Sequence, residues 1–252
     1  MINWQNRYLQ QAAWTSELRA YLFEKAGLSN ASSVLEVGCG TGAILGAAYM
    51  LKADRSTPQP ALYGVDISQA VLRECQNQVP STFLTCADAV CLPYPDKTFD
   101  ISYCHFLLLW VNDPLQALVQ MKRVTRSQGY ILAMAEPDYT ARNDNPPELS
   151  WLGKLQTESL KKQGADVSLG SRLADLFYRA EIRILETGAI KSLHKESLSY
   201  ETWENEWEVL EADLMGMVKK EEIQKIKKLD EQAWRRGEHR INVPTYFAWG
   251  QV

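Results

Sequence analysis

One short stretch in the first quarter of the chain combines the residue types and the spacing that ligand binding needs. Residues 34–42 read VLEVGCGTG, an apolar run followed by three alternate glycines. Glycine lets the backbone turn sharply and approach a ligand without a clash from a Cβ atom. A helix that starts after such a turn presents free backbone N–H groups at the same place. The stretch therefore predicts a ligand-binding turn between a buried strand and a helix.

The carboxylate inside this stretch indicates what the ligand carries. The spacing Gly38-x-Gly40-x-x-Ala43 also satisfies a loose dinucleotide fingerprint. The glycines alone therefore do not show which class of ligand binds. Glu36 lies two residues before the first glycine, where a dinucleotide site has no need of an acidic side chain. A ligand with a cationic group does need one. Glu36 thus favours a cationic ligand over a nicotinamide cofactor.

Two further carboxylates follow the next two predicted strands. Asp66 ends a strand and lies 24 positions after Gly42, where a carboxylate can accept hydrogen bonds from both hydroxyls of a ribose. Asp88 follows the third strand, where it is placed to accept a hydrogen bond from an exocyclic adenine amine. These positions favour a ligand that contains adenosine.

The elements that must hold these residues alternate between strand and helix. Short apolar runs predict seven strands, over residues 33–37, 61–65, 82–87, 99–103, 130–135, 182–189 and 246–251. Apolar stripes and capping residues predict helices over 8–26, 68–78 and 115–125, and from 171 onward. A further helix, with Leu45, Ala48 and Leu51 on its apolar side, is predicted after the glycine turn. This alternation is typical of an α/β fold with a doubly wound, mostly parallel sheet. Ligands of such sheets lie outside the carboxyl ends of the strands.

Two stretches interrupt the alternation in the later half of the chain. Residues 143–170 and 196–238 are helical in pattern and predict cap insertions over the strand ends. Residues 1–27 predict an N-terminal helical lid. We expect the whole chain, 1–252, to form a single domain.

The composition excludes several other classes of protein. With 27 Lys and Arg against 31 Asp and Glu, the net charge is −4, whereas a non-specific nucleic-acid binder needs a basic face. No apolar run reaches the roughly 18 residues of a membrane span, and residues 1–11 lack the apolar core of a signal peptide. We therefore expect a cytoplasmic protein with no nucleic-acid partner and no membrane span.

The cysteines and histidines do not indicate a metal site. Five cysteines without a CxxC pair fit reduced, mostly buried thiols. No Cys/His spacing suggests zinc, so we expect no metal ligand set. A magnesium site of Asp and Glu stays open, because it needs so few protein ligands.

Three motifs in order make the chain resemble a known family. VLEVGCGTG, LYGVDIS and CADAVCLPYPDKTFDISY are similar to the motifs of class I S-adenosylmethionine-dependent methyltransferases. Within that class the chain looks most like the ubiquinone and menaquinone biosynthesis methyltransferases and their small-molecule relatives. The resemblance is strong over residues 33–135 and holds only in outline elsewhere. It implies a Rossmann-like methyltransferase fold and S-adenosyl-L-methionine as cofactor.

The resemblance implies roles around the methionine portion of the cofactor. The strand end and the glycine turn would hold this portion, through Glu36, Gly38, Cys39, Gly40, Thr41 and Gly42. Cys104 and His105, just after the fourth strand, would line the cofactor near the sulfonium. Tyr8 on the N-terminal helix would contact it from the lid.

The resemblance also implies how the adenosine is held. Asp66 would bind the ribose, and Ile67 would pack on the adenine. Asp88 and the backbone of Ala89 would read the adenine edge.

The need for a general base depends on the acceptor. Methyl transfer from a sulfonium is an in-line displacement, to which the protein contributes mainly positioning and the exclusion of water. A phenol or alcohol must lose a proton, whereas a carboxylate, a neutral amine or an enolate may need no base. His105 is the candidate base, and a ring that merely lines the pocket is an equal interpretation.

The acceptor is expected between the sheet and the cap. Glu136, Asp138 and Tyr139 follow the fifth strand, where they either orient an acceptor or cap the loop. An apolar cap with Arg172, Arg142 and Lys191 nearby suits an acceptor with a hydrophobic body and an anionic group.

The sequence thus predicts methylation of a small or medium-sized hydrophobic metabolite, at the oxygen of a hydroxyl, a carboxylate or a peptide C-terminus. Carbon methylation of a quinol or polyketide ring is the alternative within the class. The alternatives from other classes are a nicotinamide-dependent oxidoreductase, which would lack a Tyr-x-x-x-Lys pair here, and a non-catalytic cofactor-binding module. No Asn-Pro-Pro-Tyr motif follows the fourth strand, where the chain reads Cys104-His105-Phe106-Leu107, so DNA adenine methylation is not expected. The sequence does not indicate the oligomeric state.

Overall fold

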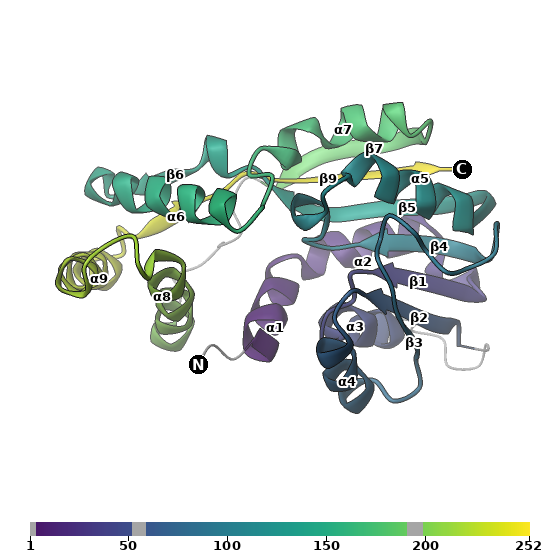
Figure 1. The fold of residues 1–252 in the computed structure, drawn as a ribbon, viewed down its shortest axis with the longest axis horizontal. Coiled ribbons are helices and arrows are strands. Elements are labelled where there is room, and N and C mark those ends of the chain that lie inside the picture. The colour runs from purple at the N-terminus through teal and green to yellow at the C-terminus, as the bar shows by residue number, and fades with distance from the viewer. Residues whose placement is uncertain (1–3, 52–58, 191–198) are drawn as a thin grey trace.

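The computed structural model describes residues 4–51, 59–190 and 199–252. Seven strands form one sheet in the order β3-β2-β1-β4-β5-β9-β7 (Figure 1). Their bounds are β1 Ser33–Val37, β2 Ala61–Asp66, β3 Phe83–Cys86, β4 Phe99–Cys104, β5 Thr125–Pro137, β7 Arg183–Ile190 and β9 Thr245–Gln251. Strands β1 to β5 pair in parallel, and β9 runs antiparallel to both β5 and β7. The predicted doubly wound, mostly parallel sheet is confirmed.

Helices cover both faces of the sheet. One face carries α5 (Pro114–Val124) and α7 (Leu169–Arg179), whose buried side chains join those of the strands in one apolar core. The other face carries α2 (Ser16–Lys25), α3 (Ala43–Leu51) and α4 (Gln69–Gln78) over a second core. The two faces bury apolar side chains from the same strands, which explains why the strands read as nearly continuous apolar runs.

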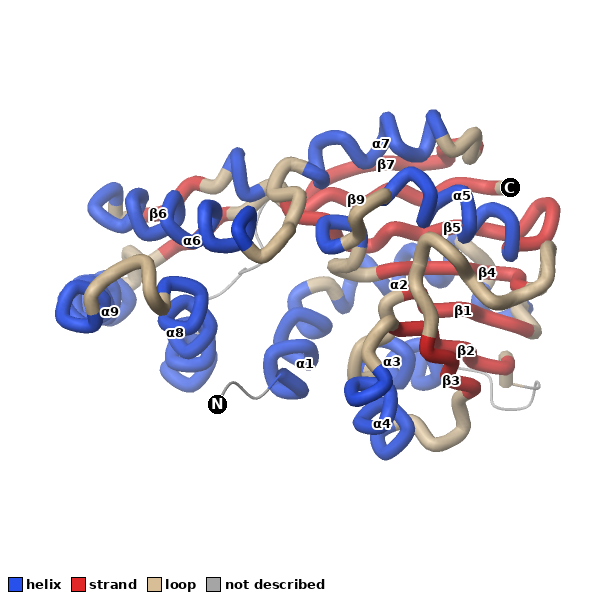
Figure 2. The backbone as a smooth tube through the Cα atoms, in the orientation of Figure 1, coloured by secondary structure: helices blue, strands red, loops and turns tan. Residues whose placement is uncertain are grey.

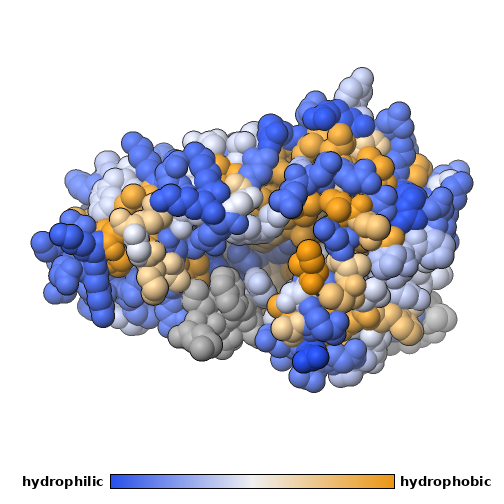
Figure 3. Space-filling model, viewed as in Figure 1, coloured by the Kyte–Doolittle hydropathy of each residue, from blue (hydrophilic) through white to orange (hydrophobic). Residues whose placement is uncertain are grey.

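A third group of elements lies beside the sheet. It consists of α6 (Ser150–Lys162), α8 (Tyr200–Leu214), α9 (Lys220–Arg235) and a two-stranded sheet of β6 (Asn143–Asn145) with β8 (Arg240–Asn242). These helices share an apolar core of their own. Figure 1 shows the group to the left of the sheet, and in Figure 3 the surface between the two is hollowed.

A buried carboxylate ties α8 to α9 inside this third core. Both indole N–H groups of Trp203 and Trp207 donate to Asp230 Oδ2, at 2.8 and 2.6 Å. His239 Nδ1 lies 2.6 Å from the other oxygen of Asp230. Because buried polar groups need hydrogen-bond partners, these contacts explain how a carboxylate that is 1% exposed is tolerated.

The N-terminal segment differs from the single helix predicted over 8–26. The helix breaks at Thr15 into α1 (Trp4–Trp14) and α2. Thr15 Oγ1 lies 3.4 Å from the carbonyl oxygen of Ala12 and 2.8 Å from His105 Nε2. Figure 2 shows α1 standing off the sheet, between α3 and α8. The break lets α1 lie beside the loops at the strand ends.

The described residues contain neither a membrane-spanning helix nor a cluster of metal ligands. No helix among them is long and apolar enough to cross a membrane. No three of their His, Cys, Asp or Glu side chains gather as a metal site would require.

Candidate active site

The glycine turn after β1 adopts a backbone that requires glycine. The N–H groups of Gly38 and Cys39 both donate to the carbonyl oxygen of Val65, at 2.7 and 3.0 Å, which fixes the turn against β2. Gly38 has a φ of +74°, and a Cβ atom there would lie 2.5 Å from Leu107 Cδ1. An L-residue at Gly38 would therefore meet both backbone strain and a steric clash.

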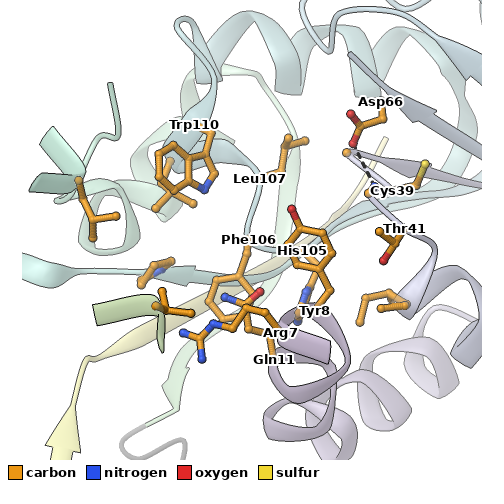
Figure 4. A pocket seen from close by; sticks show the side chains of 18 of the residues that line it. Arg7, Tyr8, Gln11, Cys39, Thr41, Asp66, His105, Phe106, Leu107 and Trp110 are labelled. Atoms are coloured by element: carbon orange, nitrogen blue, oxygen red, sulfur yellow. Dashed lines mark hydrogen bonds between the residues drawn. The ribbon is translucent and has the colours of Figure 1, made fainter. Parts of the chain in front are cut away.

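Asp66 connects the glycine turn to the start of α4. One carboxylate oxygen accepts a hydrogen bond from the Gly40 N–H at 3.0 Å, and the other accepts from the Ser68 N–H at 2.9 Å. The contact with the glycine turn is the dashed line in Figure 4. A carboxylate held in this way has a fixed position at the edge of the sheet, from which its free lone pairs can accept further hydrogen bonds.

Glu36 is an acid buried at the end of β1, with 2% of its surface exposed. Burial raises the pKa of Glu36 well above its usual range, while the hydrogen bond from Tyr103 and the charge of Arg19 act in the opposite direction. The Tyr103 hydroxyl donates to Glu36 Oε2 at 3.0 Å. Since an adjacent cation favours the ionised carboxylate, Glu36 is suited to a ligand that brings a positive charge.

Three adjoining cavities surround these residues. The largest, which we call the central cavity, has a volume of about 360 Å³ and lies between the glycine turn, α1 and the loop after β4. The rim cavity, of about 240 Å³, lies on the other side of Leu107. The cap cavity, of about 70 Å³, lies toward α6 and α8. The central cavity shares wall residues with each of the other two.

The cavities bring together most of the residues predicted from the sequence. The central cavity is lined by Tyr8, Glu36, Gly38, Cys39, Gly40, Thr41, Asp66, His105 and Tyr139. The rim cavity is lined by Gly38, Asp66, Ile67, Asp88 and Ala89. Figure 4 shows Tyr8, His105, Cys39, Thr41 and Asp66 around one space.

Five other predicted residues do not line these cavities. Cys104 is fully buried in the sheet, and Gly42 faces Cys75. Asp138 accepts from the Thr140 N–H at 2.9 Å and caps a turn. Arg172 lies exposed on α7 and pairs with Asp166.

The fifth, Glu136, binds the backbone of the loop after β4. Its two carboxylate oxygens accept hydrogen bonds from three consecutive backbone N–H groups, those of Leu107, Leu108 and Leu109, at 3.1, 3.0 and 3.2 Å. Burial raises the pKa of Glu136 to about 7, against these hydrogen bonds. Glu136 thus positions the loop that separates the central and rim cavities.

Arg142 and Lys191 were also expected near the acceptor. Lys191 lies outside the described residues. Arg142 lines the cap cavity, where its Nε donates to Asp144 Oδ1 at 2.8 Å.

Several wall residues were not singled out from the sequence. Two come from α1, two from the loop after β4, and the rest from α6, the residue directly after it, and α8: Arg7, Gln11, Leu107, Trp110, Gln156, Gln163, Val209 and Asp213. On α1 the spacing of Arg7, Tyr8 and Gln11 places all three on one face, which was the available signal. The α6 and α8 residues come from helices of the group beside the sheet, and no local pattern reveals where that group lies.

His105 is a neutral ring held by a hydroxyl. Burial lowers the pKa of His105 to about 3, and the charge of Arg19 acts in the same direction. Its Nε2 lies 2.8 Å from Thr15 Oγ1, and its ring stands edge-on to Phe106. These contacts favour the interpretation of His105 as a pocket-lining ring, and its role as a base stays a prediction.

Replacing His105 by glutamine should make the free energy of unfolding fall less steeply as the pH is lowered. The folded pKa of about 3 lies below the unfolded value of 6.5, so the unfolded chain binds the extra proton below pH 6.5. The wild type therefore loses about 1.4 kcal/mol of unfolding free energy per pH unit on acidification from this group. Urea unfolding at pH 7.5 and pH 5 would show a smaller loss in His105→Gln. A rate loss of about 100-fold with a changed pH profile would instead support a general base.

The family model that matches this chain and two of its sequence relatives are described as methyltransferases. A methyltransferase domain model matches residues 35–133. The O-methyltransferase resE of Aspergillus sclerotiorum is 30% identical over 204 residues, which make up 74% of this chain and 70% of that protein. A malonyl-[acyl-carrier protein] O-methyltransferase of Pseudescherichia vulneris is 32% identical over 110 residues, 44% of this chain and 41% of that protein. The chain spans about half the length of the first curated relatives it matches, between 41% and 55%.

The fold has close counterparts among solved structures. One is a protein of an antibiotic biosynthesis pathway of Anabaena variabilis, described as a methyltransferase, with a TM-score of 0.69 and 15% identity over 96% of this chain and 100% of that one. At this identity the likeness shows the fold alone. With the sequence relatives, it establishes that the chain belongs to the class I S-adenosylmethionine-dependent methyltransferases. The resemblance of the three motifs is thereby confirmed, and with it S-adenosyl-L-methionine as the cofactor.

The walls of the central cavity fit this cofactor. Thr41 Oγ1 is buried on the wall and has no hydrogen-bond partner among the described residues. A buried hydroxyl of this kind suits a polar ligand that supplies the missing partner. Glu36 supplies a carboxylate for a cationic group, and Asp66 lies on the walls of both the central and the rim cavity.

Proposed function

We propose that the protein transfers a methyl group from S-adenosylmethionine to an oxygen atom of a small or medium-sized hydrophobic metabolite. The arrangement of the cavities carries this proposal. The central cavity meets the glycine turn and Asp66 on one side and the cap cavity on the other. One continuous space can therefore hold a methyl donor and an acceptor. The relatives named O-methyltransferase support oxygen as the acceptor atom.

Each part of the cofactor would have its own partners. Glu36 and the hydroxyl of Thr41 would hold the polar end of the methionine portion in the central cavity. Asp66 would accept hydrogen bonds from the ribose hydroxyls. The adenine would lie in the rim cavity beside Ile67, with Asp88 at its amine.

The remaining wall residues would position the acceptor and exclude water. The bound cofactor supplies a methyl group already activated on a sulfonium. Tyr8 of α1 and Trp110 of the loop after β4 both line the central cavity, where they would shield the reacting atoms from solvent. Apolar side chains such as Phe106 and Val209 line both the central and cap cavities and would hold a hydrophobic acceptor. Positioning of this kind supplies much of the rate of an in-line displacement.

Two measurements test this proposal in sequence. Calorimetric titration should show binding of S-adenosylhomocysteine and none of NADH. Incubation with [methyl-¹³C]S-adenosylmethionine and a panel of phenols, alcohols and acids should then yield a labelled product. The carbon-13 shift of the label distinguishes a methyl group on oxygen from one on carbon. A C-methyl product would replace the proposal with ring methylation, and binding without any transfer would point to a non-catalytic module.

A further inference from the structure

Arg7 presents a guanidinium to the part of the site where an acceptor would lie. It lines both the central and the cap cavity. Its Nη1 donates to Gln10 Oε1 at 3.2 Å, and its guanidinium carbon lies 4.8 Å from the centre of the Trp14 ring. These contacts hold the side chain, yet it forms no ion pair with any carboxylate of the described residues. Figure 4 shows Arg7 on α1 beside Tyr8 and Gln11.

The other charges around the acceptor space have partners or lie on another element. Arg142 is engaged by the carboxylate of Asp144. Asp213 accepts from the side-chain amides of Gln156 and Gln163, at 2.8 and 3.1 Å. Asp213 and Glu206, the carboxylates that line these two cavities besides Glu36 and Asp66, both lie on α8, opposite the glycine turn. Arg7, on the α1 side of the space, is thus a cation that an anionic acceptor could bind.

Two acid–base groups on the wall of the central cavity, His105 and Glu36, already contact other described side chains. His105 Nε2 is engaged with Thr15, and Glu36 accepts from the Tyr103 hydroxyl deep at the end of β1. A phenol or alcohol must lose a proton in the course of transfer, whereas a carboxylate reacts as the anion that it already is. Guanidinium groups match the planar geometry of carboxylates and bind them with two parallel hydrogen bonds.

We propose, on the basis of the proposed function, that the acceptor is a carboxylic acid and that Arg7 binds the carboxylate that becomes methylated. A lone pair of one carboxylate oxygen forms the new C–O bond, and the S–CH₃ bond breaks with its electron pair left on sulfur. The negative charge of the acid and the positive charge of the sulfonium disappear together, and no proton moves. The ester no longer pairs with Arg7, which favours its release.

Matched acids and alcohols test this proposal on the full-length protein. The probes are benzoate, trans-aconitate and decanoate, each compared with its primary amide, and benzoate also with benzyl alcohol. Transfer of a labelled methyl group should occur to the acids alone, and mild alkali should release the label as methanol because the product is an ester. Between pH 6 and 9 the rate should stay level, since the acceptor is already ionised and transfer to it needs no base.

Arg7 variants locate the carboxylate. Arg7→Gln should raise KM for the acid about 10- to 100-fold, the range for losing a charge-assisted contact, and Arg7→Lys should recover part of this loss. Arg179→Gln, which removes an exposed arginine of α7 paired with Asp175, is the matched control and should behave as the wild type. Binding of S-adenosylhomocysteine should change less than threefold in Arg7→Gln, because Arg7 serves the acceptor.

Several results would overturn the proposal. An alkali-stable product, a preference for the alcohol, or no binding and no methylation of any acid would each do so. A loss of S-adenosylhomocysteine affinity in Arg7→Gln with KM for the acid unchanged would assign Arg7 to the carboxylate of the cofactor instead. Failure of the proposed function can be told apart from failure of the carboxylate proposal, because in the former case no acceptor of any class gains a methyl group.

Discussion

Replacement of Asp66 by alanine is expected to lower the affinity for S-adenosylhomocysteine about 10- to 200-fold, or roughly 1.5–3 kcal/mol, the range for hydrogen bonds to a charged group. The carboxylate does two things at once. It accepts from the Gly40 and Ser68 N–H groups, which holds the glycine turn, and it lies where we place the ribose hydroxyls. Both are lost in the variant. Isothermal titration with S-adenosylhomocysteine measures the effect.

Two control variants separate the causes of that loss. Asp175→Asn changes a carboxylate of α7 whose side chain is 63% exposed. This variant should bind S-adenosylhomocysteine as the wild type does. Asp66→Asn keeps an acceptor oxygen for one of the two N–H groups but removes the charge, so its affinity should fall between those of the wild type and Asp66→Ala. An unchanged affinity in Asp66→Ala would remove the ribose assignment.

The part of the site built from local signals could be predicted from the sequence. Strand β1 covers the predicted residues 33–37, and β2 extends the predicted 61–65 by one residue. Both strands are short, apolar and bounded by turn residues, a local pattern that is typical of buried strands. The carboxylates at their ends then fall at one edge of the sheet, because parallel strands end on the same side. This is why Glu36 and Asp66 lie on one cavity.

The parts that depend on tertiary packing could not be predicted in the same way. Strand β5 begins at Thr125 and not at 130, because Thr125 pairs with Phe99 of β4 before an irregular stretch, and regular pairing resumes at Tyr130. The stretch 143–170 contains the short strand β6, which exists only because β8, almost a hundred residues later, pairs with it. Arg7 lies on α1, which lines the central and cap cavities beyond the break at Thr15, a position that carries no glycine or proline to signal the break.

Glu136 shows how one residue type can serve either of two roles that sequence cannot separate. An acid after the fifth strand was expected to orient an acceptor or to cap a loop. The structure directs both oxygens to the backbone of the loop after β4, and the side chain is fully buried. Which role applies depends on the path of a loop some 30 residues earlier in the chain, where Phe106 has a φ of +51°. No pattern around Glu136 encodes that path.

Replacement of Glu136 by alanine is expected to lower the free energy of unfolding by about 3 kcal/mol or more, since each buried donor left without a partner costs about 1–3 kcal/mol. Three backbone N–H groups lose their acceptor in the variant. The same loop carries Leu107, which separates the central and rim cavities, so affinity for S-adenosylhomocysteine should fall as well. Urea denaturation at pH 7.5 measures the first effect, and calorimetric titration measures the second.

Glu136→Gln is the matched control, because it keeps one acceptor oxygen and the shape of the side chain but cannot ionise. The folded pKa of about 7 lies above the unfolded value of 4.5, so the folded protein binds the extra proton between these two pH values. The stability that this group contributes is therefore lost as the pH rises from 4.5 to 7, by about 1.4 kcal/mol per unit. The glutamine variant should lack this slope. If alanine and glutamine cost equally little at every pH, the three hydrogen bonds would not hold the loop, and the separation of the two cavities would need another cause.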